Sequence, residues 1–172
     1  MKSSDERAEA DLRAEIARRA KGKVAVVAIG NIMRSDDGLG SKLIELLRAA
    51  RAKAALFDCG TAPENYIFPI LSAGCDTVIL IDAADLGIEP GRARVLDLDG
   101  IMNVSFSTHS PSPRLFTDLL KTGKEDINIF IVSVQPRSTA LGGPLSGEVS
   151  AGCEALAGIL VEALGRNDDK LR

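Results

Sequence analysis

The chain has 172 residues, a hydrophobic fraction of 45% and a formal net charge of −3. This length suits one domain with a substantial core, and because only 3% of the residues are aromatic, aliphatic side chains must fill that core. No lysine and arginine cluster marks a surface that follows a nucleic-acid backbone, and no apolar run approaches the ~20 residues that span a bilayer. Residues 1–20 also lack the apolar stretch of a signal peptide. We therefore expect a cytoplasmic protein with no nucleic-acid partner and no membrane span.

In the first half of the chain, apolar spacing predicts helices and strands in alternation. Residues 4–20 have the mixed charge and alanine content of a surface helix. Residues 24–29 form a continuous apolar run, which is typical of a parallel strand buried on both faces. Next we expect a helix from Leu39, a strand over 54–57, a helix over 63–71 and a strand over 77–81 that ends at Asp82.

The second half continues the alternation. The segment GIEPG marks a turn, after which residues 92–96 return as a strand. Then follow a helix over about 113–121, a buried strand over 127–134, a loop over 135–147 and a last helix over about 148–164. Strands alternating with helices at this spacing indicate an α/β fold, a single three-layer α/β/α sandwich with a largely parallel twisted sheet. We divide the chain into a helical extension over 1–22, the domain over 23–165 and a frayed tail over 166–172.

Three polar residues are expected at one edge of this sheet. Ligands of such folds gather at the carboxyl ends of the strands. Asp37 follows the first strand, Asp82 ends the third, and His109, the single histidine, lies in the loop before the helix at 113. Two carboxylates and an imidazole suit nickel, zinc or a related divalent ion. The sequence therefore predicts a metal site that joins these three side chains.

Each residue also has a plainer interpretation. Asp36 or Asp37 can cap the helix that begins near Leu39, Asp82 can accept hydrogen bonds from a loop backbone, and His109 can be a solvated loop residue. A dinucleotide fingerprint, a phosphate loop and a nucleophile elbow are lacking. A serine hydrolase with His109 as the base stays open, because serines flank this residue.

The three cysteines are few and widely spaced. Cys59, Cys75 and Cys153 match neither a paired-cysteine zinc site nor a redox motif. We expect all three to be buried structural thiols in a reducing compartment.

Five short segments in order resemble one known family. They are GNIMRSDDGLG at 30–40, DCGTAPEN at 58–65, LIDAADLGIEPG at 80–91, STH at 107–109 and VQP at 134–136. Together they are similar to the [NiFe]-hydrogenase maturation proteases, endopeptidases that trim the C-terminal tail of the hydrogenase large subunit. The APEN and DAADLGIEPG segments resemble the formate-hydrogenlyase-type branch. The resemblance covers about residues 24–160.

The resemblance implies roles for individual positions. The catalytic and metal-binding residues correspond to Asp37, Asp82 and His109, and Asp36 corresponds to a supporting position, expected to be a cap. Asn31 and residues 60–65 would shape the cleft for the substrate tail. Two departures affect substrate selection rather than the three ligands: prolines follow His109 by two and four residues, and Arg137 stands where an acidic residue is common.

The implied activity is removal of the C-terminal tail from a nickel-loaded [NiFe]-hydrogenase large-subunit precursor. Nickel would be carried by the substrate and act as a recognition mark, with zinc or cadmium able to take its place. Two carboxylates and one imidazole leave coordination positions open for ligands from this partner. The alternative is a non-catalytic nickel chaperone or sensor of hydrogenase assembly, built on the same three ligands.

Overall fold

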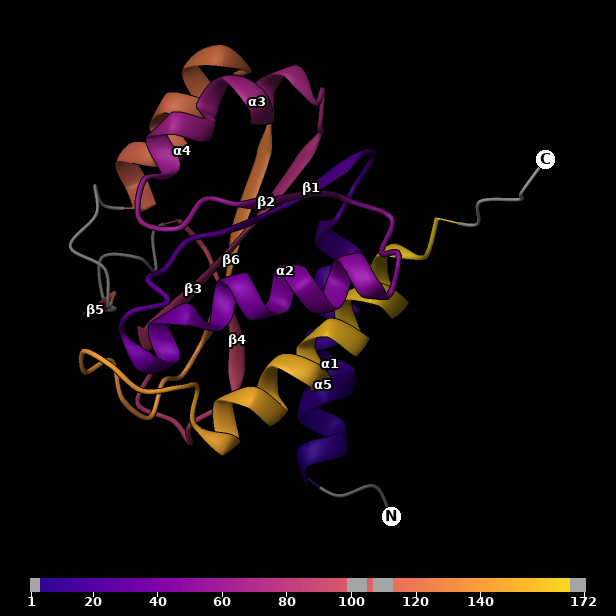
Figure 1. The fold of residues 1–172 in the computed structure, drawn as a ribbon. Helices are drawn as coiled ribbons and strands as arrows, with labels where there is room; N and C mark the ends of the chain where they lie inside the picture. The colour runs from indigo at the N-terminus through magenta and orange to yellow at the C-terminus, as the bar shows by residue number, and fades with distance from the viewer. Residues whose placement is uncertain (1–3, 99–104, 107–112, 168–172) are drawn as a thin grey trace.

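The structure, a computed structural model, describes residues 4–98, 105–106 and 113–167. Helices alternate with strands along the chain (Figure 1). The strands are β1 Val24–Ala28, β2 Ala55–Asp58, β3 Thr77–Asp85, β4 Ala93–Leu96, β5 Ser105–Phe106 and β6 Asn128–Val134. The helices are α1 Ser4–Arg19, α2 Leu39–Ala49, α3 Ile67–Ser72, α4 Pro113–Gly123 and α5 Gly147–Leu164, with short 3-10 turns η1 Ser35–Gly38 and η2 Pro63–Tyr66.

The sheet is mostly parallel, as predicted. Its order is β2-β1-β3-β6-β4, in which β4 alone pairs antiparallel, and the two-residue β5 pairs antiparallel with the end of β3. The central strands β1, β3 and β6 are almost completely buried. Their continuous valine and isoleucine runs follow from this position, because helices cover both faces of a parallel sheet.

Helices cover the two faces and complete the predicted three-layer α/β/α sandwich (Figure 1). One face, with Val26, Ile79 and Val132, packs against α1, α2 and α5. The alternate residues of the same strands, such as Val27 and Leu80, pack against α3 and α4. This two-residue alternation determines which face of the sheet each polar side chain joins.

Helix α1 is packed on the domain and contributes to its core. Ile16 is completely buried among residues of α5 and the sheet, and Leu12 packs against the same cluster. Polar contacts add to this, since Arg13 pairs with Glu162 and the Arg19 guanidinium lies 5.6 Å from the ring centre of Phe130. The segment before β1 thus covers apolar surface that would otherwise face water.

We expect Ile16→Ala to lower the free energy of unfolding by about 2–5 kcal/mol, because it removes a completely buried side chain from a closed cluster. Urea unfolding followed by circular dichroism measures this change. Arg7→Ala, on the exposed side of the same helix, is the control and should change the stability by less than about 0.5 kcal/mol. An Ile16→Ala protein as stable as the control would show that α1 does not belong to the cooperative core.

The three cysteines are free and buried, as expected. Burial, with a smaller contribution from Asp58, raises the pKa of the Cys59 thiol to about 12. Burial similarly raises the pKa of Cys153 to about 12. Both thiols are therefore protonated at neutral pH and are poor nucleophiles or metal ligands. Over the part of the chain that the structure describes, no helix is long and apolar enough to cross a membrane.

Candidate functional site: a buried pair of aspartates at the sheet edge

Asp82 lies inside β3, and the prediction that it ends the strand was wrong. The pairing of β1 with β3 ends at Ala28 and Ile81, whereas β3 continues beside β6 and β5 as far as Asp85. Asp82 is thus the first β3 residue beyond this ladder with β1, on the α3 and α4 face because it alternates with Leu80. Here the chain after β1 leaves the sheet and makes room for a side chain.

The carboxylate of Asp82 is in an unfavourable environment for a charge. Its side chain is only 1% exposed, and no side chain among the residues that the structure describes donates a hydrogen bond to either oxygen. Burial raises the pKa of Asp82 well above its ordinary value, and the negative charge of Asp37 raises it further, while the backbone N–H of Ala83 partly offsets both. A buried carboxylate in this position binds either a proton or a cation.

Asp37 reaches the same place from the turn after β1. It lies in η1, completely buried, and η1 contacts β3. The backbone of Gly30 passes so close that a β-carbon there would lie 2.1 Å from the Asp37 carbonyl oxygen, and that oxygen accepts the Asn31 N–H at 3.1 Å. Gly30 also has a φ of +153°, which favours glycine. The glycine of the GN segment therefore allows the turn that brings Asp37 beside Asp82.

Asp36 supports the site, but it does not cap the helix α2. The residue before α2 is Gly38, and no side chain caps that helix, so the capping predicted for Asp36 or Asp37 was wrong. Instead the buried carboxylate of Asp36 accepts four hydrogen bonds from the loop over 135–147. The donors are Arg137 N (2.8 Å), Ser138 N (3.0 Å), Ser146 N (2.6 Å) and Ser146 Oγ (3.0 Å).

These bonds hold the loop over 135–147 against η1. Two further contacts join the same segments, because Ser35 Oγ donates to the Pro144 carbonyl at 3.1 Å and Gly142 N donates to the Met33 carbonyl at 2.8 Å. The two adjacent aspartates, Asp36 and Asp37, thus have different roles. Asp36 fixes the loop, and Asp37 lies beside Asp82.

His109, the third predicted ligand, lies outside the described residues. The structure therefore brings together two of the three predicted site residues, Asp37 and Asp82. Among the described residues, no three histidine, cysteine, aspartate or glutamate side chains lie close enough together to hold a metal ion.

Ser133 is a polar neighbour that the sequence did not single out. It pairs with Asp82 in the register of β3 and β6, so both side chains lie on the same face of the sheet. Ser133 is completely buried, and its hydroxyl has no hydrogen-bond partner among the described residues. The signal available in the sequence was a single small polar residue, Ser133, within the apolar run of β6. Its hydroxyl can donate to a group bound at Asp82.

The motifs of the sequence are also joined in space. Gln135 Oε1 accepts the Leu86 N–H at 2.7 Å, and Gln135 Nε2 donates to Asp85 at 3.3 Å, which links VQP to the DAADLGIEPG segment. Gly30 N donates to the Gly60 carbonyl at 3.0 Å, which links the GN and DCG segments. Four of the five segments therefore build one edge of the sheet.

A hollow of about 340 Å³ opens beside this edge. Its wall includes Asn31, Gly60 and Thr61 of the residues expected to shape a cleft, whereas residues 62–65 do not line it. The remaining lining residues are Gly30, Ile32, Ser41, Asp58, Cys59 and Tyr66. Ser41 Oγ donates to Asp58 at 3.0 Å and so ties α2 to the end of β2 in this wall.

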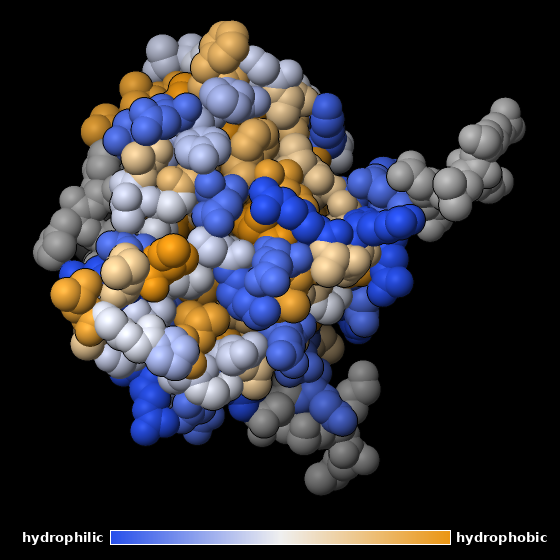
Figure 2. Space-filling view, in the orientation of Figure 1, coloured by the Kyte–Doolittle hydropathy of each residue, from blue (hydrophilic) through white to orange (hydrophobic). Residues whose placement is uncertain are grey.

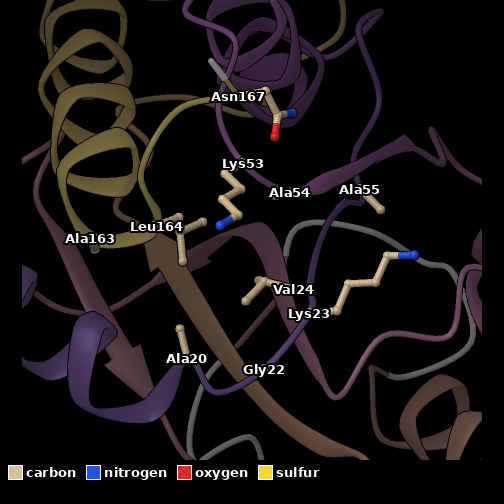
Figure 3. A pocket seen from close by; sticks show the side chains of 10 residues that line it. All are labelled: Ala20, Gly22, Lys23, Val24, Lys53, Ala54, Ala55, Ala163, Leu164 and Asn167. Atoms are coloured by element: carbon tan, nitrogen blue, oxygen red, sulfur yellow. The ribbon is translucent and has the colours of Figure 1, made fainter. Parts of the chain in front are cut away.

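The cavity of about 610 Å³ shown in Figure 3 lies at the other end of the sheet. Its lining comes from the starts of β1 and β2 and from the end of α5, including Val24, Ala55 and Leu164. The described residues that line this cavity include neither an acid nor a histidine, so they do not offer the acid chemistry of the aspartate pair.

Comparisons with known proteins agree with the geometry. A family model described as hydrogenase maturation protease matches residues 41–163. The hydrogenase 3 maturation protease of Escherichia coli K12 is 31% identical over 134 residues, which cover 76% of this chain and 84% of the relative.

Solved structures show the same architecture. The [NiFe] hydrogenase maturation protease HycI from Thermococcus kodakarensis KOD1 superposes with a TM-score of 0.78 at 27% identity, over 87% of this chain and 98% of the other. The endopeptidase HycI from Escherichia coli gives a TM-score of 0.72 at 28% identity, over 84% and 93%.

Proposed function

The chain belongs to the hydrogenase maturation protease family, endopeptidases that process the C-terminus of a hydrogenase large subunit, and we propose that it acts on a nickel-loaded [NiFe]-hydrogenase precursor. In this proposal nickel arrives with the substrate and is the mark by which the precursor is recognised. Asp37, Asp82 and His109 contact the ion, and cleavage takes place beside it. The cytoplasm, where precursors are assembled, is the proposed location.

One observation carries this proposal: Asp82 is buried beside Asp37, and no side chain among the described residues neutralises its charge or donates a hydrogen bond to it. Two adjacent carboxylates repel each other, and a divalent cation removes both the repulsion and the need for a proton. Carboxylate and imidazole ligands suit nickel, and the substrate's own ligands complete its coordination. In this proposal the aspartate pair receives metal that the precursor carries.

The residues around the aspartate pair determine where the substrate tail would bind. The hollow beside Asn31 and Gly60 accommodates the substrate tail next to the aspartate pair. Asp37, Asp82 and His109 would hold the ion here, and when bound it would supply Lewis-acid polarisation of the scissile carbonyl. The Ser133 hydroxyl, beside Asp82 in the register, can donate a hydrogen bond to the ligand shell.

The decisive experiment is mass spectrometry of the large-subunit precursor after incubation with the protein, with nickel and without it. We expect loss of a C-terminal peptide from the nickel-loaded precursor alone. Zinc-loaded or cadmium-loaded precursor shows whether other divalent ions replace nickel. Cleavage of the metal-free precursor at the same rate would exclude nickel as the recognition mark.

The same experiment separates the alternatives. A nickel chaperone or sensor would bind the ion and leave the mass of the partner unchanged. A serine hydrolase with His109 as its base would lose activity after treatment with a serine-directed inhibitor, whereas a metal-dependent cleavage would not.

A further inference from the structure

Three large apolar side chains stand exposed beside the candidate site. Ile32 is 69% exposed, Met33 is 63% exposed, and Leu141 is 79% exposed. Ile32 and Met33 belong to the turn between β1 and η1, and Leu141 to the loop over 135–147. We call these three residues the apolar rim.

The apolar rim is one surface, although its residues are far apart in sequence. Gly142 N donates to the Met33 carbonyl at 2.8 Å, which places Leu141 next to Met33. Ile32 and the residues that follow Gly142 line a common hollow of about 250 Å³. Hydrophobic side chains are visible in Figure 2 at the edge of the molecule where this loop lies in Figure 1.

The rim is continuous with the aspartate pair. Ile32 packs against Gly38, the residue after Asp37, and a β-carbon at Gly38 would lie 3.1 Å from the Ile32 Cα. Ile32 also lines the hollow of about 340 Å³ that contains Asn31 and Gly60. Ile32 and Ser41 therefore stand between two adjacent hollows, one beside the proposed cleavage site and one beside the loop over 135–147.

Hydrogen bonds hold the rim in place, most of them to the buried carboxylate of Asp36. The four hydrogen bonds to Asp36 and the bond from Ser35 to Pro144 fix the loop that carries Leu141. The side chain of Leu141 on this loop faces water. An apolar surface that is both rigid and exposed is typical of a recognition site.

We propose that the apolar rim docks the hydrogenase large-subunit precursor, which places apolar side chains of the precursor against Ile32, Met33 and Leu141, beside the two hollows. This inference rests on the proposed function and names the surface through which the substrate binds. Its occupant is the precursor because the rim borders the cleavage site directly. Apolar anchors at the centre of such a contact contribute most of its affinity.

The test is single-turnover cleavage of nickel-loaded precursor with excess protein, which gives a half-saturating concentration and a maximal rate constant. In the double variant Met33→Ser, Leu141→Ser we expect the half-saturating concentration to rise about tenfold or more, with a smaller effect on the maximal rate constant. Phe68→Ser on α3, where the side chain is equally exposed at 79%, is the matched control and should leave both values unchanged. An unchanged half-saturating concentration in the double variant would overturn the proposal.

Hydrogen exchange separates this inference from the proposed function. Backbone amides of residues 31–34 and 139–143 should exchange more slowly when nickel-loaded precursor is present. Protection without cleavage would support the docking surface and overturn the protease function, whereas cleavage without protection would do the reverse. The absence of both protection and cleavage would overturn both the docking surface and the protease function.

Sedimentation of the protein alone tests whether a second copy of the chain occupies the rim. A wild-type dimer that is lost in the double variant would identify that second copy as the occupant and would overturn the proposal.

Discussion

Asp82→Asn should abolish precursor cleavage and, at the same time, raise the stability of the metal-free protein. The rate of cleavage is expected to fall at least about 10³-fold. An amide is a poor metal ligand, so the variant loses several kcal/mol of metal-dependent stabilisation of the transition state. The gain in stability has a separate cause. A buried carboxylate without a hydrogen-bond partner costs about 1–3 kcal/mol, and a neutral side chain of the same shape avoids its charge.

The pH dependence of this gain follows from the raised pKa of Asp82. In the unfolded chain Asp82 is ionised above its ordinary pKa, whereas the folded protein binds a proton there up to a higher pH, so the unfolded state binds fewer protons. Stability contributed by the protonated carboxyl is therefore lost as the pH rises through the raised pKa, and it returns as the pH falls. The variant should exceed the wild type most at neutral pH and least in mild acid.

Thermal unfolding of chelator-treated protein measures this difference, and about 2–4 °C per kcal/mol is expected for a domain of this length. Asp118→Asn, an exposed aspartate on α4, is the matched control for the change in charge and should leave the midpoint unchanged. Nickel should raise the midpoint of the wild type and not that of Asp82→Asn. A variant less stable than the wild type at every pH would show that the carboxylate has a structural role.

The central sheet could be predicted because the burial of each strand leaves an apolar pattern within that strand's own sequence. Strands β1 and β6 are buried on both faces, so each appears as an unbroken apolar run, and α2 shows its helical spacing from Leu39 onward. The end of β3 could not be predicted in the same way. Asp82 was expected to stop the strand, yet β6 and β5 supply backbone partners beyond it, and those partners come from distant parts of the chain.

The site shows the same limit. The order of the sheet brings the ends of β1 and β3 together, so the meeting of Asp37 and Asp82 followed from topology. The task of Asp36 did not, because its partners lie 101 to 110 residues away and no local pattern marks them. Ser133 was missed because a single serine within a buried strand resembles any other small core residue.

Asp36→Ala should cause a large loss of both stability and cleavage. Its carboxylate accepts the backbone N–H groups of Arg137, Ser138 and Ser146, and the substitution leaves these partly buried donors without an acceptor. At about 1–3 kcal/mol for each unsatisfied group, a loss of several kcal/mol is expected. The loop over 135–147 also loses its attachment to η1, so Asp37 and the apolar rim shift together.

Asp36→Asn and Arg137→Ala make this prediction specific. Asparagine keeps one oxygen, which can still accept from Arg137 N and Ser138 N, but its amide nitrogen then faces the N–H of Ser146, so an intermediate loss is expected. Arg137→Ala removes only an exposed ion pair with Glu148 from the same loop and should cost less than about 1 kcal/mol. Urea unfolding and single-turnover cleavage of nickel-loaded precursor measure the series. Equal effects of Asp36→Ala and Arg137→Ala would mean that the loop is held by its surface charge, whereas a graded loss through Asp36→Asn would identify the buried carboxylate as the group that builds this side of the site.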